Sequence, residues 1–249
     1  MGGFRDDFDG ALDTAVWIPH YLPQWSSRAA SAATYETGGS ELHLTIPAAQ
    51  GIWCEGDHEP PLRVSGVQSG SWSGPVGSGY GQQRYADGLV VREEQPRFEG
   101  WLPSSGHVEI RCRMTLSPRS MGALWLAGFE DDEAQLRCGE LCVVEIFGRS
   151  VHDGSCEVGM GIKAFRDPAL TQDFDAPRLP VDPAGFHTYA VDWDGDEAVF
   201  TVDGVEVRRC PRPPTYPLQL MVAVYDFPGW SVGGDDHLVP ELVVDHIAG

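Results

Sequence analysis

The sequence has few basic residues: 17 Lys and Arg stand against 37 Asp and Glu, which gives a formal net charge of -20 over 249 residues. A surface this acidic repels phosphate groups, so we expect neither nucleic acid nor an anionic membrane as a partner. No stretch approaches the roughly 20 consecutive apolar residues that are needed to cross a bilayer. A neutral ligand such as a sugar is compatible with this charge.

The N-terminus lacks a basic region followed by an apolar run, and therefore shows no signal peptide. We expect a cytoplasmic protein if the sequence is complete as written, and a secreted one if a leader precedes it. The six cysteines form no Cys-x-x-Cys pair. A chain of this length can bury a large core without disulfides, which favours free thiols.

Gly (30) and Pro (19) are abundant, which suits many turns and short strands. Apolar and polar residues alternate at period two over 40–46 and 107–114, which is the pattern of half-buried strands. The same alternation over 186–193 and 197–202, joined by Asp-Gly-Asp, predicts a hairpin. A turn at Asp203-Gly204 leads into a further strand. The sequence predicts an all-β protein, and we interpret residues 1–249 as a single domain.

Two segments interrupt this pattern. Residues 65–85 are rich in Gly and Ser, and residues 167–183 are rich in Pro and Asp. We expect both to be long loops, which in compact domains are usually functional.

Two carboxylates lie in an otherwise apolar run, Gly-Glu-Leu-Cys-Val-Val-Glu-Ile-Phe-Gly, at Glu140 and Glu145. An unpaired carboxylate is costly to bury, so both side chains are expected to face a cleft. Hydrolysis of a glycosidic bond with retention of configuration uses such a pair, about 5–5.5 Å apart. In a regular strand, however, Glu140 shares a face with Cys142, and Glu145 points the other way. A β-bulge near Val143 and Val144 would bring the two glutamates to one face.

This segment resembles the catalytic strand of glycoside hydrolase family 16, whose pattern is Glu-x-Asp-x-x-Glu. Other pieces are similar to the family in order and spacing across nearly the whole chain. They are the N-terminal segment 4–17, the strand 122–126, the hairpin 186–204 and the core strand 217–224.

The resemblance implies a β-jelly-roll sandwich of two antiparallel sheets, of the concanavalin A-like kind. It implies Glu140 as nucleophile, Glu145 as general acid and base, and Trp125 in the wall of a sugar subsite. The expected activity is endo-acting hydrolysis of β-1,3- or β-1,3/1,4-glucan, with a polysaccharide or oligosaccharide as the substrate, by a monomer that needs no cofactor.

The sequence departs from the family pattern at two positions. Cys142 replaces the Asp between the glutamates, and we count it with the catalytic residues because of its place. A His that family members often carry on the next strand is missing, and Lys163 is expected near that place. These departures leave two alternatives open, a working enzyme and a sugar-binding protein that has lost turnover. The absent signal peptide motivates a third, an intracellular sandwich protein with an unrelated ligand or partner.

Further aromatic residues are candidates for sugar subsites, because aromatic faces stack on sugar rings. Trp230 ranks first, since it follows Pro228-Gly229 in a loop that resembles one flanking the family's cleft. His187 is interpreted as structural. A structural calcium ion at Asp6, Asp7 and Asp245 is a weak expectation, and no other metal is expected. The remaining aromatic candidates are Trp53, Trp72, Tyr80 and Tyr225.

Overall fold

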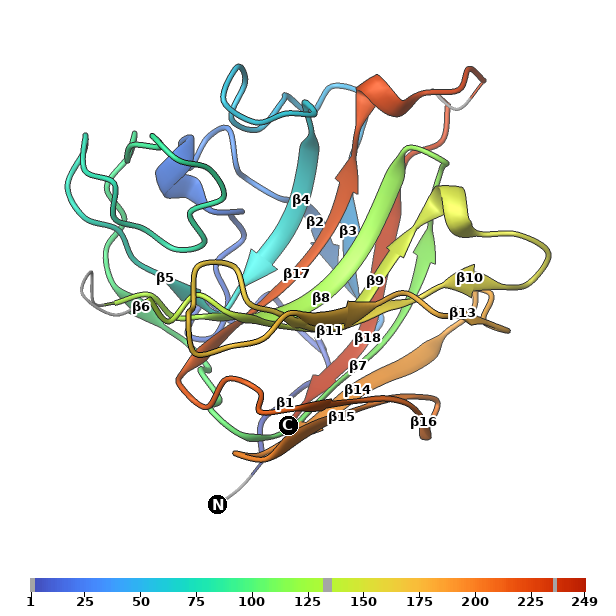
Figure 1. Ribbon diagram of the computed structural model, residues 1–249. Coiled ribbons are helices and arrows are strands. Elements are labelled where there is room, and N and C mark those ends of the chain that lie inside the picture. The colour runs from blue at the N-terminus through green and yellow to red at the C-terminus, as the bar shows by residue number, and fades with distance from the viewer. Residues whose placement is uncertain (1–2, 132–135, 235–236) are drawn as a thin grey trace.

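The computed structural model describes residues 3–131, 136–234 and 237–249. Within these ranges the regular structure is almost all antiparallel strand, and helical structure is limited to three short 3₁₀ turns. The predicted all-β sandwich of two large sheets is confirmed (Figure 1). The three turns are η1 (Pro23–Trp25), η2 (Gly148–Ser150) and η3 (Pro228–Trp230).

The first sheet has eight strands and brings the two ends of the chain together, because β1 (Arg5–Asp6) pairs with β18 (Glu241–Ala248). The predicted hairpin is confirmed as β14 (His187–Trp193) and β15 (Glu197–Val202), and β16 (Val205–Pro211) follows the Asp203-Gly204 turn. The remaining strands of this sheet are β7 (Gly106–Thr115), β3 (Leu42–Thr45) and β2 (Thr34–Thr37).

The second sheet has six strands in the order β12-β11-β9-β8-β17-β4, and it carries the run with the two glutamates as its third strand. The strands are β12 (Asp173–Asp175), β11 (Gly159–Lys163), β9 (Glu140–Phe147), β8 (Ser120–Gly128), β17 (Leu218–Asp226) and β4 (Arg63–Gln68). Two pairs of short strands lie beside the large sheets: β10 (Cys156–Glu157) with β13 (Arg178–Leu179), and β5 (Gly70–Ser71) with β6 (Phe98–Glu99).

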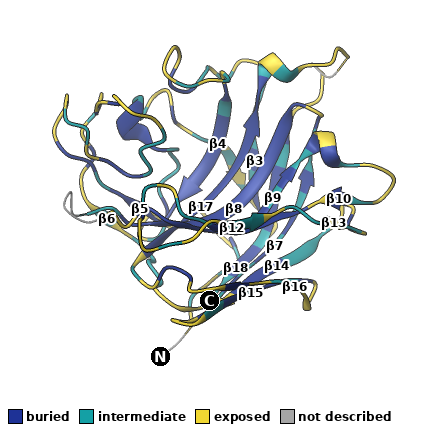
Figure 2. Ribbon diagram, viewed as in Figure 1, coloured by how far each residue is buried: buried dark blue, intermediate teal, exposed yellow. Residues whose placement is uncertain are grey.

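Alternation along the strands sorts side chains between the two faces of the second sheet. In β8, Leu124 and Leu126 join the main core between the sheets, and Ala123 and Trp125 join a second cluster on the opposite face. Full burial of a leucine stabilises the fold by roughly 1.5–3 kcal/mol. The leucines therefore hold one side of the strand against the core, and the residues that alternate with them face outward. Figure 2 shows that the central strands are buried on both faces, since long loops cover the outer one.

Both predicted long loops are partly wrong. Residues 65–68 belong to β4, and a second short strand, β5, follows them. The glycine content suggested a loop, but Gly66 lies within a strand and packs closely against β17. An added Cβ there would lie 2.8 Å from the Ala223 side chain. The segment 167–183 contains β12 and β13, short edge strands whose polar sequence carries little apolar alternation.

All six cysteines are buried free thiols, as the sequence favours. Among the described residues, no helix is long and apolar enough to cross a membrane.

Candidate active site

Strand β9 contains a bulge. Its pairing with β8 places Cys142 opposite Trp125 and Val144 opposite Leu124, so Val143 has no counterpart on β8. The register with β11 shifts at the same place. One extra residue in a strand reverses the alternation beyond it. The bulge predicted near Val143 and Val144 is therefore confirmed.

The bulge puts both glutamates on one face. Val143 and Val144 are both fully buried in the core between the sheets. Glu140, Cys142 and Glu145 line a pocket on the opposite face. The strand thus turns three polar or ionisable side chains toward one cavity, and keeps Leu141, Val143, Val144 and Ile146 in the core.

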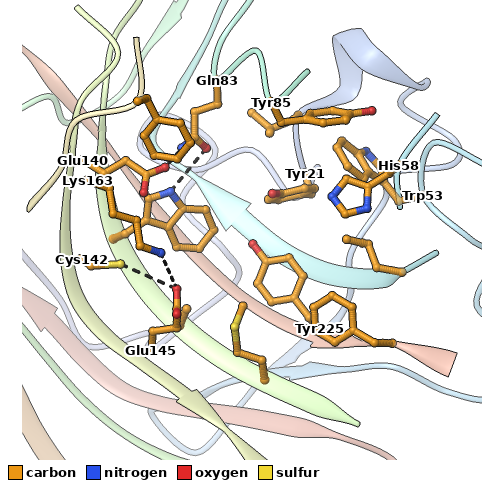
Figure 3. Close-up of a pocket in the computed structure, with 17 residues that line it drawn as sticks. Tyr21, Trp53, His58, Gln83, Tyr85, Glu140, Cys142, Glu145, Lys163 and Tyr225 are labelled. Atoms are coloured by element: carbon orange, nitrogen blue, oxygen red, sulfur yellow. Dashed lines mark hydrogen bonds and ion pairs between the residues drawn. The ribbon is translucent and has the colours of Figure 1, made fainter. Parts of the chain in front are cut away.

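The pocket has a volume of about 220 Å³ and lies over the outer face of the second sheet (Figure 3). The two glutamates lie on one side of it, and aromatic side chains face them from the other. The walls come from β8, β9, β11 and β17 and from five segments that connect strands. Its lining is Tyr21, Leu22, Trp53, His58, Leu62, Gln83, Tyr85, Met121, Ala123, Trp125, Glu140, Cys142, Glu145, Lys163, Phe165, Tyr225 and Phe227.

Glu140 is only 4% exposed. Burial raises the pKa of its carboxyl group to about 8, and the negative charge of Glu145 adds to the effect. The Lys163 ammonium group and a hydrogen bond donated by the Gln83 side chain oppose it. At neutral pH the proton is therefore held on Glu140 in the free pocket.

Glu145 is paired with Lys163, the only lysine in the sequence. The ammonium Nζ lies 2.8 Å from Glu145 Oε2, and in the sheet Lys163 lies opposite Glu140. Burial lowers the pKa of Lys163, but the acidic groups of Cys142, Glu145 and Glu140 outweigh it and raise the pKa overall. Lys163 is thus a charged neighbour of both glutamates, at the place where the sequence predicts it.

Cys142 lies between the glutamates, and its Sγ is 3.9 Å from Glu145 Oε2. Burial raises the pKa of this thiol well above its ordinary value. The thiol is therefore neutral and a weak hydrogen-bond donor, and it is a poor nucleophile because the thiolate is the reactive form.

The aromatic candidates divide into two groups. Trp125, Trp53 and Tyr225 line the pocket and are almost completely buried. Trp230 does not line it: it stacks on the pocket residue Phe227, with ring centroids 4.2 Å apart. Trp72 and Tyr80 are also absent from its lining.

The sequence alone did not identify several lining residues. Tyr21 packs edge-on against Tyr225, with ring centroids 5.5 Å apart. Gln83 bonds Glu140 and accepts a hydrogen bond from Trp125 Nε1 at 3.4 Å. His58 and Tyr85 complete the aromatic side. These four residues lie in irregular segments, where the sequence has no periodic pattern that predicts the direction of a side chain.

A partly buried ion pair positions the Gln83 loop. The Glu130 carboxylate accepts a hydrogen bond from the Gln83 backbone N–H at 2.6 Å and one from Arg166 at 2.7 Å. Arg166 also donates to the carbonyl oxygen of Arg84. Gln83 has a φ of 44°, a left-handed conformation that a non-glycine residue holds only when its surroundings fix it.

No group of three or more His, Cys, Asp or Glu side chains within the described ranges could hold a metal ion. Asp6 accepts from the Trp17 indole N–H, Asp7 pairs with Arg5, and Asp245 pairs with Arg111. A calcium ion at these aspartates would have to displace the protein groups that now contact them. Calcium binding here stays a prediction. His187 bonds Asp203 at 2.7 Å within the hairpin, which agrees with a structural role.

The family model described as glycosyl hydrolases family 16 matches residues 105–235, which include β7 to β17 and both glutamates. The chain belongs to glycosyl hydrolases family 16. No curated protein sequence matches it.

Solved structures of other glycoside hydrolases share its fold. A GlcNAcα1-4Gal-releasing endo-β-galactosidase from Clostridium perfringens is 22% identical, with a TM-score of 0.80. The match covers 98% of this chain and 61% of that one, so the chain spans less than two thirds of that protein. A laminarinase from Flavobacterium sp. UMI-01 is 16% identical with a TM-score of 0.66, and 98% and 97% of the two chains are covered. At these identities the likeness establishes the jelly-roll fold.

Proposed function

We propose that this family 16 protein hydrolyses β-glycosidic bonds with retention of configuration, with Glu140 as nucleophile and Glu145 as general acid and base. The observation that carries the proposal is the bulge in β9, because it turns both carboxylates into one pocket. Retention needs two carboxyl groups about 5–5.5 Å apart that flank the scissile bond.

The first step needs Glu140 ionised and Glu145 protonated, so the single proton of the pair must lie on Glu145. Glu140 then attacks the anomeric carbon while Glu145 protonates the leaving oxygen, which gives a glycosyl-enzyme ester on Glu140. In the second step Glu145 takes a proton from water, which displaces the sugar from Glu140. Lys163 contacts Glu145 throughout and can stabilise the carboxylate that forms when Glu145 gives up its proton. The aromatic side chains exclude water and offer faces for stacking on sugar rings.

The proposed substrate is a β-1,3- or β-1,3/1,4-glucan, cut within the chain. The laminarinases and a lichenase among the matched structures support this choice by their fold. A β-galactan is the second substrate to test, because an endo-β-galactosidase overlays with a TM-score of 0.80.

The direct test measures release of reducing ends from laminarin, mixed-linkage glucan and β-galactan. Glu140→Gln and Glu145→Gln should each lower kcat by a factor on the order of 10²–10⁴. NMR of the first product should show the β-anomer. Release of the α-anomer first would contradict retention, and absence of turnover on all three polymers would contradict the hydrolase.

A second candidate is a sugar-binding protein without turnover. It is favoured by Cys142 at the position of the family's Asp, and by the burial that keeps Glu140 protonated. Calorimetry with oligosaccharides of these polymers separates the two: binding by the native protein with no product after days would support this candidate.

A further inference from the structure

A second hollow, of about 450 Å³, lies next to the pocket and shares Glu145 with it. Glu145 lines both hollows, so a chain that reaches the carboxylates can extend into the second one. The walls of the second hollow differ from those of the first: two arginines, Arg149 and Arg178, and the rings of Phe147 and Phe174 line it.

Arg149 is distinctive because it is charged, exposed and held only by aromatic rings. Its guanidinium carbon lies 5.0 Å from the centroid of Phe147 and 4.7 Å from that of Trp230. Within the part of the chain that the structure describes, it makes no hydrogen bond or ion pair. By contrast, Arg178 pairs with Glu157 at 3.1 Å.

Stacking leaves the edge of a guanidinium available. A planar guanidinium stacked on rings keeps its N–H groups at the edge, where they can bind two oxygens of an anion at once. A protein with a net charge of -20 has little free positive charge to offer. A free arginine beside the proposed catalytic pair is therefore a feature that favours a negatively charged group on the substrate.

We infer that the second hollow is a subsite for a sugar that carries an anionic substituent, a sulfate ester or a carboxylate, which Arg149 binds. The inference rests on the proposed function for its place in the cleft. With Glu145 as the general acid, the subsite holds the leaving-group side of the substrate. Trp230 supports the subsite by fixing the Arg149 guanidinium, although it lines neither hollow.

The test uses matched oligosaccharides of β-1,3-glucan and β-galactan in three forms: neutral, chemically sulfated, and oxidised at C6 to the carboxylate. Binding is measured by calorimetry on Glu140→Gln, which prevents turnover, and on the same variant with Arg149→Gln. Arg212→Gln is the matched control, because Arg212 is also exposed but lines neither hollow.

The expected result is that at least one anionic form binds roughly tenfold or more tightly than its neutral partner, since hydrogen bonds to charged groups are the strong ones. Arg149→Gln should abolish that preference while leaving neutral binding within about twofold, and Arg212→Gln should leave the preference intact. A preference limited to the sulfated or to the oxidised form identifies the anion.

Equal binding of neutral and anionic forms, an equal loss of both in Arg149→Gln, or no binding of any form would overturn the inference. These outcomes are distinct from failure of the proposed function. Hydrolysis of neutral polymers without an anionic preference refutes the subsite alone. An Arg149-dependent preference in a native protein without turnover refutes the hydrolase alone.

Discussion

At the scale of single residues, Glu140 sets the expected pH dependence. Its pKa of about 8 means that the proposed nucleophile is mostly protonated below this pH. Because the reaction needs Glu140 ionised and Glu145 protonated, the pair must hold a single proton. We therefore expect kcat/KM to fall about tenfold per pH unit above pH 8, where that proton is lost. The measurement is a pH profile of laminarin hydrolysis at low substrate concentration. A profile that already falls above pH 5–6 would contradict the raised pKa of Glu140.

The same shift predicts the pH dependence of stability. A carboxyl group with a raised pKa in the folded state stabilises the protein fully below its unfolded pKa, and this contribution is lost as the pH rises through the folded pKa. The window therefore runs from 4.5 to about 8 for Glu140. Glu130, whose burial raises its pKa to about 7, adds a loss of the same sign.

Glu140→Gln should remove its share of that slope, at most about 1.4 kcal/mol per pH unit. Denaturant unfolding of the native protein and the variant at pH 5, 6.5 and 8 tests this. The variant should gain relative stability as the pH rises. A constant difference between the two proteins would contradict the raised pKa.

Cys142 allows a test of whether its thiol takes part in the reaction. Its thiol is neutral because burial raises its pKa, so it cannot serve as the nucleophile. Cys142→Ser should therefore retain turnover within about threefold, far less than the losses expected of the glutamate variants. A loss as large as that of Glu140→Gln would assign the thiol a direct role in the reaction.

The sequence pointed to Glu140 and Glu145 because carboxylates in an apolar strand have a limited set of physical explanations. It pointed to Lys163 only through the family resemblance, at the place where members often carry a His. It could not identify Gln83 or Tyr21. Their orientation depends on loop contacts that form only after the sheets are packed, such as the hydrogen bond from the Gln83 backbone to Glu130.

At the scale of elements, the bulge in β9 depends on its neighbour β11. Gly161 lies opposite Cys142 at a φ of 131°, and an added Cβ would lie 2.2 Å from the carbonyl oxygen of Asp173. Gly161→Ala should therefore destabilise the fold by roughly 1–3 kcal/mol and lower turnover, because the sheet must shift beside the glutamates. Chemical denaturation and kcat on the same samples measure both effects.

Gly195 provides the matched control, because a Cβ there meets nothing within 4 Å and the turn does not require positive φ. Gly195→Ala should leave stability and turnover nearly unchanged. Equal effects of the two substitutions would show that the close approach at Gly161 is not what fixes the site.

The loop around Gln83 is the second element that shapes the site. Its side chain donates to Glu140 and so lowers the pKa of that carboxyl. Gln83→Met, which keeps the size of the side chain, should raise the pKa of Glu140 and so move the falling limb of the pH profile to higher pH. Glu130→Ala should act in the same direction, because the backbone N–H of Gln83 loses its acceptor. An unchanged profile in both variants would show that the loop does not tune Glu140.

Regular strands were predictable at this scale, and irregular ones were not. The hairpin of β14 and β15 alternates cleanly, and its inward residues Tyr189 and Val191 are buried as the pattern requires. Strand β4 shows no alternation of apolar and polar residues, because it is buried along nearly its whole length. Its Gly66 marks a close contact with β17 and not a turn.

At the scale of the whole molecule, the net charge is the feature that the fold does not neutralise. Many arginines are already paired, as in Arg119–Asp226 at 2.7 Å and Arg97–Asp131 at 2.8 Å, so the surplus of 20 negative charges remains for the surface and the pocket. Self-repulsion of this kind lowers the free energy of unfolding, and dissolved salt screens it over a length of about 8 Å at 0.15 M.

We therefore expect the melting temperature at pH 7.5 to rise with NaCl between 10 and 300 mM. A gain of 1 kcal/mol would raise Tm by about 2–4 °C for a chain of this size. Scanning calorimetry at several salt concentrations measures the effect, and sodium sulfate at equal ionic strength separates screening from stronger apolar burial. Salt also weakens surface ion pairs. A Tm that falls with NaCl would therefore mean that the paired arginines stabilise the protein by more than repulsion among the surplus acidic residues destabilises it.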